Sequence, residues 1–145
     1  MVATRFSVAL HILLLIANDA AANSTSARLA WSIGTNPVVV RRISGQLARA
    51  GLITVQRGPG GASLTRPPAT ISLRDIWRAI HPEKEQLLRV HGRTNQTCPV
   101  GRRVPDLLRQ RFDSAESAML ENMAHTSLAD MVGSVRTESG DAVAA

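Results

Sequence analysis

Four arginines between residues 35 and 65 carry the most distinctive chemistry in this chain of 145 residues. Arg41, Arg42 and Arg49 share one face of a predicted helix, and Arg57 lies in the glycine-rich turn that follows. A guanidinium presents its N–H donors in a planar fork that fits a phosphate or the edge of a guanine. These arginines therefore favour binding to DNA, and the alternative interpretation is an ordinary solvated surface.

The helix that positions these arginines has signals at both ends. Asn36 is a strong N-cap residue, Pro37 suits the first helical position, and Gly51 suits the left-handed residue beyond the end. Val38 and Gly45 join the arginines on the outer face, where glycine lets the helix backbone approach a ligand closely. The opposite face is an apolar stripe that we expect to pack: Val40, Ile43, Leu47 and Ala50.

A hairpin follows this helix directly. The segments 52–56 and 62–65 are predicted strands, and the turn between them contains Gly58 and Gly60. A basic helix followed by an arginine-tipped hairpin is typical of a winged helix, in which the helix reads the major groove. The sequence thus predicts a mainly α (α+β) fold: a winged helix-turn-helix domain with a two-stranded wing.

The remaining segments of the first half complete this domain. Residues 6–17 predict a buried first helix, although a basic residue, an apolar run and small residues also resemble a signal peptide. Residues 27–33 predict a second helix, which a tight turn at Gly34 connects to the basic helix. Ser72 and Asp75 form a predicted capping box that starts a fourth helix, which ends at His81.

The charge is divided unevenly along the chain. The whole chain has a formal net charge of +6, and up to Ile80 nine arginines face two aspartates, so that part has +7. The remaining part has −1, from eight basic and nine acidic residues. A basic first half beside a neutral second half is what a phosphate-binding domain with a separate partner segment would show.

A long C-terminal helix is predicted from Pro105 onward. Its apolar residues recur at spacings of three and four, close to a coiled-coil seam, and predict a dimer interface, although packing on its own domain is the alternative. We predict a DNA-binding domain at 1–80, a loop with a short helix at 81–102, the dimerisation helix and a last turn at 103–132, and a disordered tail at 133–145. The predicted interface comprises Leu108, Phe112, Ala115, Met119 and Met123.

Cys98 is the only cysteine, which excludes disulfides within the chain. Near Arg102 and Arg103 it is a candidate redox sensor, although a small structural residue at a helix start is the favoured interpretation. Cys98 with His81 and His91 matches no standard zinc spacing, so we expect no metal. The sequence shows no nucleophile elbow, P-loop or other catalytic motif, and we expect no enzymatic activity.

Five segments together resemble the Rrf2 (Rrf-two) family of bacterial winged-helix transcription regulators. They are LAWSIGTNPVVVRRISGQLARAGLI, the wing RGPGGASL, ISLRDIWRAI, CPVG and SLADMV. The resemblance implies a homodimer held by the long helix, which binds a palindromic operator, and a cytoplasmic repressor. It also implies that the base-reading residues are Thr35, Asn36, Pro37, Val38 and Arg41, and that the wing tip is Arg57, Gly58 and Gly60.

The loop before the long helix departs from the cluster-binding members of that family. Those members carry three cysteines there, whereas this loop has Cys98 alone. One thiolate cannot fill three ligand positions, so we expect no iron–sulfur cluster and no other cofactor. Two rival functions stay open: an exported cationic protein with a cleaved signal peptide, and an interaction protein that reuses the winged-helix fold.

Overall fold

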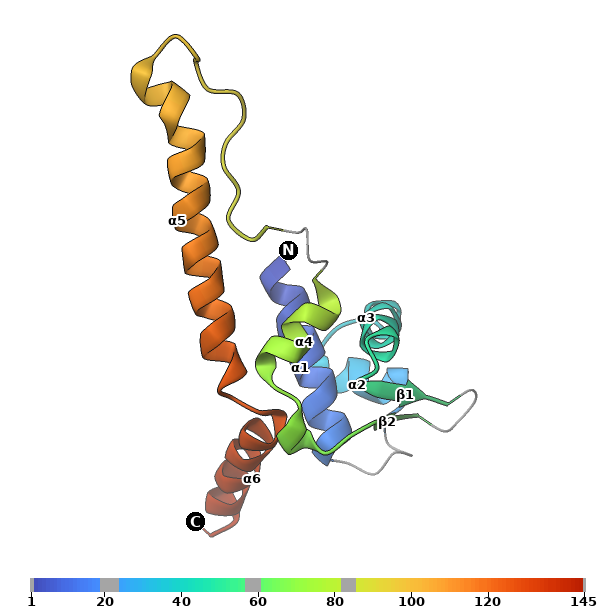
Figure 1. Ribbon diagram of the computed structural model, residues 1–145. Helices are drawn as coiled ribbons and strands as arrows, with labels where there is room; N and C mark the ends of the chain where they lie inside the picture. Colours follow the sequence, from blue (N-terminus) through green and yellow to red (C-terminus); the bar gives the residue numbers. More distant parts are fainter. Residues whose placement is uncertain (1, 19–23, 57–60, 82–85, 145) are drawn as a thin grey trace.

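The computed structural model describes residues 2–18, 24–56, 61–81 and 86–144, and α5 extends away from a body formed by the other elements (Figure 1). The predicted fold class is confirmed: the protein is mainly helical, with one two-stranded antiparallel sheet and a long C-terminal helix. In chain order the elements are α1 (Val2–Asn18), α2 (Ser26–Ile33), α3 (Pro37–Arg49), β1 (Ile53–Val55), β2 (Ala62–Leu64), the 3-10 helix η2 (Pro68–Thr70), α4 (Leu73–Ile80), α5 (Pro99–Ala124) and α6 (Leu128–Ala144).

Helices α2 and α3 form the predicted helix-turn-helix. The Thr25 side chain caps α2 by accepting from the Arg28 N–H, and Gly34 ends α2 with a φ of 78°. Two residues later the Asn36 Oδ1 atom accepts from the Val39 N–H at 3.1 Å and caps α3. In each cap the side chain accepts from an N–H only three residues further along the chain, so local residues determine where the two helices begin.

The wing is a short hairpin whose register is fixed by backbone pairing. Ile53 pairs with Leu64 and Val55 pairs with Ala62, and Gln56 donates to the Gly61 carbonyl at 3.0 Å. Gly61 has a φ of 67°, in the left-handed region that favours glycine. Arg57, Gly58 and Gly60, the predicted wing tip, lie outside the described residues.

The hydrophobic core lies among α1, α3, α4, the base of the wing and the start of α6. Ile12 and Leu13 of α1 and Leu128 of α6 are fully buried, although more than a hundred residues separate these two helices in the chain. Trp31 is different: although it is a large apolar residue on α2, it is 73% exposed. Trp31 lies on the outer side of α2, whose buried residues are Leu29 and Ala30.

Helices α4 and α6 both start with a capping box, and the two starts lie side by side. Ser72 and Asp75 exchange hydrogen bonds at the start of α4, as predicted, and Ser127 and Asp130 do the same at the start of α6. The two segments also pair with each other, since Leu128 donates to the Ile71 carbonyl at 2.8 Å. This pairing returns the chain from α5 to the winged-helix body.

The C-terminal half differs from the prediction in three places. Helix α5 begins at Pro99 instead of near Pro105, because Cys98 caps it and Pro99 occupies the first helical position. No helix forms at residues 86–90. The segment from 133 is helical up to residue 144 instead of disordered, because it continues α6 from a capped start and a buried first turn that includes Val132.

Candidate nucleic-acid interface

The outer face of α3 is exposed and basic, whereas its inner face is fully packed. Val40, Ile43 and Leu47 are at most 1% exposed, so the rotation of α3 about its axis is fixed. The opposite side presents the predicted DNA-binding residues, with Val38 63% exposed. Arg41 and Arg42 are also exposed, and neither forms an ion pair with a described residue. The helix can therefore present two guanidinium groups and an apolar side chain to the edges of bases.

The start of α3 uses one predicted contact residue for its own folding. Asn36 is exposed, but its Oδ1 atom accepts the capping hydrogen bond, which leaves the Nδ2 amide for a ligand. Thr35 and Pro37 are half-buried beside it. The free N–H groups of the first turn add positive potential at this end of the helix, where α3 has no acidic residue.

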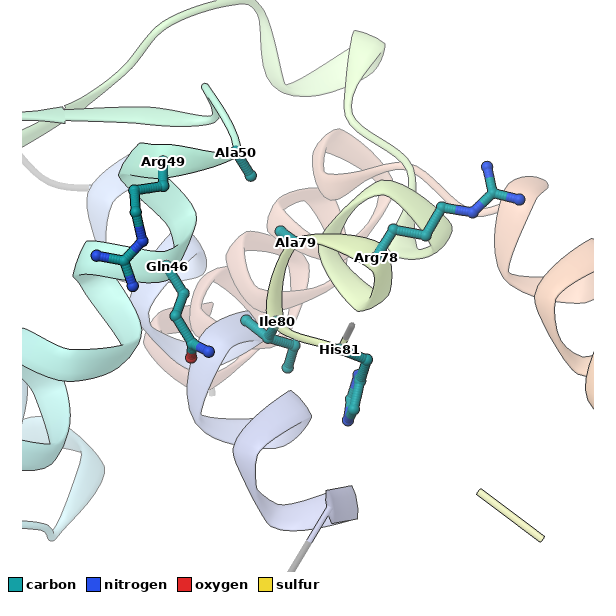
Figure 2. Close-up of a pocket in the computed structure, with 7 residues that line it drawn as sticks. All are labelled: Gln46, Arg49, Ala50, Arg78, Ala79, Ile80 and His81. Atoms are coloured by element: carbon teal, nitrogen blue, oxygen red, sulfur yellow. The ribbon is translucent and has the colours of Figure 1, made fainter. Parts of the chain in front are cut away.

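Arg49 lies at the last turn of α3, on the side that faces α4. Figure 2 shows it with Gln46 at a hollow of about 330 Å³ between α3 and α4, where Arg78 points away from the two. Its guanidinium lies back along α3, so that a Cβ atom added at Gly45 would be 3.4 Å from Nη1. Arg49 is exposed, as predicted for the outer face. Ala50 ends the helix and is also exposed, contrary to the prediction that it packs.

A cation–π pair on α2 was missed by the sequence analysis. The Arg28 guanidinium carbon lies 4.5 Å from the centre of the Trp31 ring. Arg28 and Trp31 are three residues apart on a helix, and this spacing could have revealed the pair. The exposed Trp31 ring gives the surface of α2 a flat apolar patch beside a positive charge.

Helix α5 has no buried residue along its 26 residues. Leu107 on its surface is 55% exposed and Val100 is 69% exposed. Within the predicted stripe Ala115 is exposed, and the other four residues are half-buried: Leu108, Phe112, Met119 and Met123. The structure therefore leaves this stripe incompletely covered by its own chain.

The loop before α5 runs alongside that helix (Figure 1), and polar contacts bind the two together. The Arg109 guanidinium donates to the Gln86 side chain at 2.6 Å and to the Leu88 carbonyl at 2.9 Å. The Leu88 N–H donates to the Glu116 carboxylate at 2.7 Å. These contacts hold the loop on one side of α5.

Cys98 is exposed and serves as the N-cap of α5. Its Sγ atom accepts from the Gly101 N–H at 3.4 Å, and its carbonyl accepts from Arg102 at 2.9 Å. Gly101 is needed there, because a Cβ atom would lie 2.9 Å from the Asn95 carbonyl oxygen. Within the described parts of the chain, no three histidine, cysteine, aspartate or glutamate residues are placed to hold a metal ion.

The capped basic helix, the two-stranded wing and the projecting helix define a winged helix-turn-helix protein. A family model described as "Rrf2: Iron-dependent Transcriptional regulator" matches residues 2–134. The chain therefore belongs to the Rrf2 family, as the resemblance implied, and it is a transcription regulator and not an enzyme.

Three relatives illustrate this similarity. YwnA of Bacillus subtilis (strain 168), a candidate HTH-type transcriptional regulator, is 41% identical over 132 residues, which cover 91% of this chain and 97% of YwnA. A crystal structure of a candidate DNA-binding protein is 38% identical with a TM-score of 0.70, covering 88% of this chain and 97% of that one. IscR of T. potens is 19% identical with a TM-score of 0.66. The match covers 91% of this chain and 85% of IscR, and it shows the shared fold.

Among the described residues, no helix is both long and apolar enough to cross a lipid bilayer. The longest one, α5, carries charged side chains throughout, including Arg109 and Glu116.

Proposed function

We propose that this protein is a cytoplasmic, homodimeric repressor that binds a palindromic DNA operator. The observation that carries the proposal is the division of α3, whose inner face is buried in the core while Val38, Arg41 and Arg42 stand exposed on its outer face. A helix fixed in this way can enter a major groove with a defined set of side chains toward the bases.

The lack of buried residues in α5 supports the proposed homodimer. A helix of 26 residues without a buried side chain gains little stability from its own chain, and its apolar stripe needs a second surface. The same stripe of a second copy is the simplest surface, since a two-fold interface is self-complementary. The two α3 helices would then read two half-sites related by the same two-fold axis.

We further propose that the protein works without an iron–sulfur cluster, although the family description names iron. Clusters of this kind need several thiolate ligands, and Cys98 is the single cysteine of the sequence. Its thiol caps α5, so its oxidation would disturb the start of the helix that joins the two protomers. We therefore propose Cys98 as a redox-sensitive residue, with DNA release as the readout.

The two rival functions are less well supported by the structure. An exported form cleaved near residue 22 would lose Ala9, Ile12 and Leu13, each fully buried in the core. An interaction protein would not need the cationic face of α3, and it would show no dependence on DNA sequence.

The decisive test of DNA recognition is Arg41→Ala measured against a selected operator. We expect this change to lower affinity by about 1–3 kcal/mol and to relax base preference at one position in each half-site. A phosphate contact would instead reduce the slope of log affinity against log salt by roughly one per site occupied. Arg111→Ala on the exposed surface of α5 is the matched control. A wild-type salt slope near zero would remove the DNA-binding proposal.

A further inference from the structure

A cavity of about 380 Å³ lies between the start of α2, the middle of α3 and the base of the wing. One part of its lining is apolar and includes Leu29, Ala48 and Val55. The other part is polar and includes Ser24, Ser26 and Arg41. The cavity volume is within the range of sites that hold small organic molecules.

Ser24 gives this cavity an unmet hydrogen-bonding group. Its side chain is 3% exposed, and its Oγ atom has no hydrogen-bond partner among the described residues. A buried hydroxyl without a partner is unfavourable, and most such groups in proteins are satisfied by a neighbour or a bound molecule. Because Ser24 lines the cavity, rotation of its side chain toward the cavity would let a ligand there supply the missing partner.

The electrostatics of the cavity favour a negatively charged ligand. Its lining includes Arg41, and among the described residues it contains no aspartate or glutamate. Helix α2 starts at its edge, with Thr25 as N-cap and no acidic residue in the first turn. The free N–H groups and the helix dipole at such an end attract anions.

We propose that this cavity binds a small apolar carboxylic acid as an effector. The carboxylate accepts from Ser24 Oγ and pairs with Arg41, and the hydrocarbon part lies against Leu29 and Ala48. A phosphate of the DNA backbone would use the polar side alone and leave the apolar wall unused. The proposal is therefore specific for an anion that also carries a hydrocarbon group.

Occupancy of the cavity would affect the DNA-reading face directly. Arg41 belongs both to the cavity lining and to the exposed face of α3. A carboxylate that holds Arg41 competes with DNA for the same guanidinium, so the ligand lowers operator affinity. This consequence rests on the proposed function, whereas binding of the acid itself does not.

The test is a titration of the full-length, DNA-free protein with benzoate. Binding is monitored by isothermal calorimetry and by the changes in backbone amide chemical shifts. We expect saturable binding, with shifts concentrated at Ser24–Ser26 and Ser44–Ala48. Benzamide, the neutral analogue, and inorganic phosphate, the anion without a hydrocarbon, should bind at least about tenfold more weakly. Equal binding of benzamide would overturn the anionic class, and equal binding of phosphate would assign the cavity to the DNA backbone.

Two variants locate the site and two controls match them. Ser24→Ala should weaken benzoate binding about tenfold and leave the melting temperature unchanged or higher, because it removes an unpaired buried hydroxyl. Ala48→Leu should abolish benzoate binding by filling the cavity. If Ala48→Leu does not fold, the result for Ser24→Ala alone decides whether benzoate binds in this cavity. Ser117→Ala and Ala27→Leu, both at exposed positions outside the cavity, should bind like wild type.

The outcomes separate this proposal from the proposed function. Wild-type binding by both cavity variants, or no saturation up to about 10 mM benzoate, would overturn the site. If benzoate binds as described and leaves operator affinity unchanged, the regulatory role is wrong. If no operator is bound at all, the titration of the DNA-free protein still decides whether the acid site exists.

Discussion

Helices α3 and α5 are both amphipathic, but only α3 buries its apolar face within the chain. In α3 the apolar residues Val40, Ile43 and Leu47 are buried within the chain. In α5, which is twice as long, no residue is buried, and Val100 and Leu107 are exposed. Apolar periodicity therefore indicates that a face will be covered, but it does not say whether the cover comes from the same chain or from another.

The largest effect is expected where α3 joins the core. Leu47→Ala removes a fully buried side chain and should lower the free energy of unfolding by about 2–5 kcal/mol in urea denaturation. Leu107→Ala on α5, at a concentration where the chain is monomeric, should change it by less than about 0.5 kcal/mol. Equal losses for the two variants would contradict the difference between the helices.

The dimer is tested by adding a charge to the stripe of α5. Phe112→Asp removes a side chain whose burial is worth about 1.5–3 kcal/mol in each protomer and places a carboxylate in the proposed interface. Light scattering should show monomers that bind a half-site weakly. Gln110→Asp adds the same charge at an exposed position of α5 and should stay dimeric. A dimeric Phe112→Asp protein would show that α5 is covered in another way.

The two N-caps offer a smaller contrast, since α3 is capped by a carboxamide and α5 by a thiol. Serine is a strong N-cap, so Cys98→Ser should keep the start of α5 and remove only the thiol chemistry. Peroxide, which oxidises a thiolate to sulfenic acid, should lower operator affinity of the wild type at least about fivefold and leave the variant unchanged. The same response from both proteins would make Cys98 a structural cap alone.

The smallest expected effect concerns pH at the junction that follows α5. Hydrogen bonds from the Ser127 N–H and hydroxyl lower the pKa of Asp130 from its ordinary value of 3.8. Because the folded pKa is lowered, this contribution to stability is present above the ordinary value and is lost as pH falls through the folded value. Denaturation at about pH 2.5 and pH 6 should show this loss in the wild type. Asp130→Asn should lack that component of the pH dependence.

Local signals in the sequence were reliable where a few neighbouring residues decide the structure. The caps at Asn36 and Ser72 were predicted because each uses a side chain and an N–H three residues apart. The wing register and the positive φ of Gly51 and Gly61 are likewise fixed by interactions between residues close together in the chain. The exposed basic face of α3 also follows from local spacing, once its opposite face is known to pack.

Features that depend on distant segments were not predictable in the same way. Trp31 is apolar and lies on a helix, yet its exposure depends on which side of α2 faces the core. The helical segment after residue 132 looked too polar to fold, but its first turn is anchored by Leu128 against Ile71.

The sequence by itself determined the helix-turn-helix, the wing and the cationic face, because caps, turns and periodicity act over fewer than about ten residues. The tertiary structure alone decided that α6 completes the core, that no residue of α5 is fully buried, and that Ser24 and Arg41 line one cavity. The physical reason is that burial and electrostatic potential depend on which elements meet in space. No local pattern specifies a contact between residues as far apart in the chain as Ile71 and Leu128.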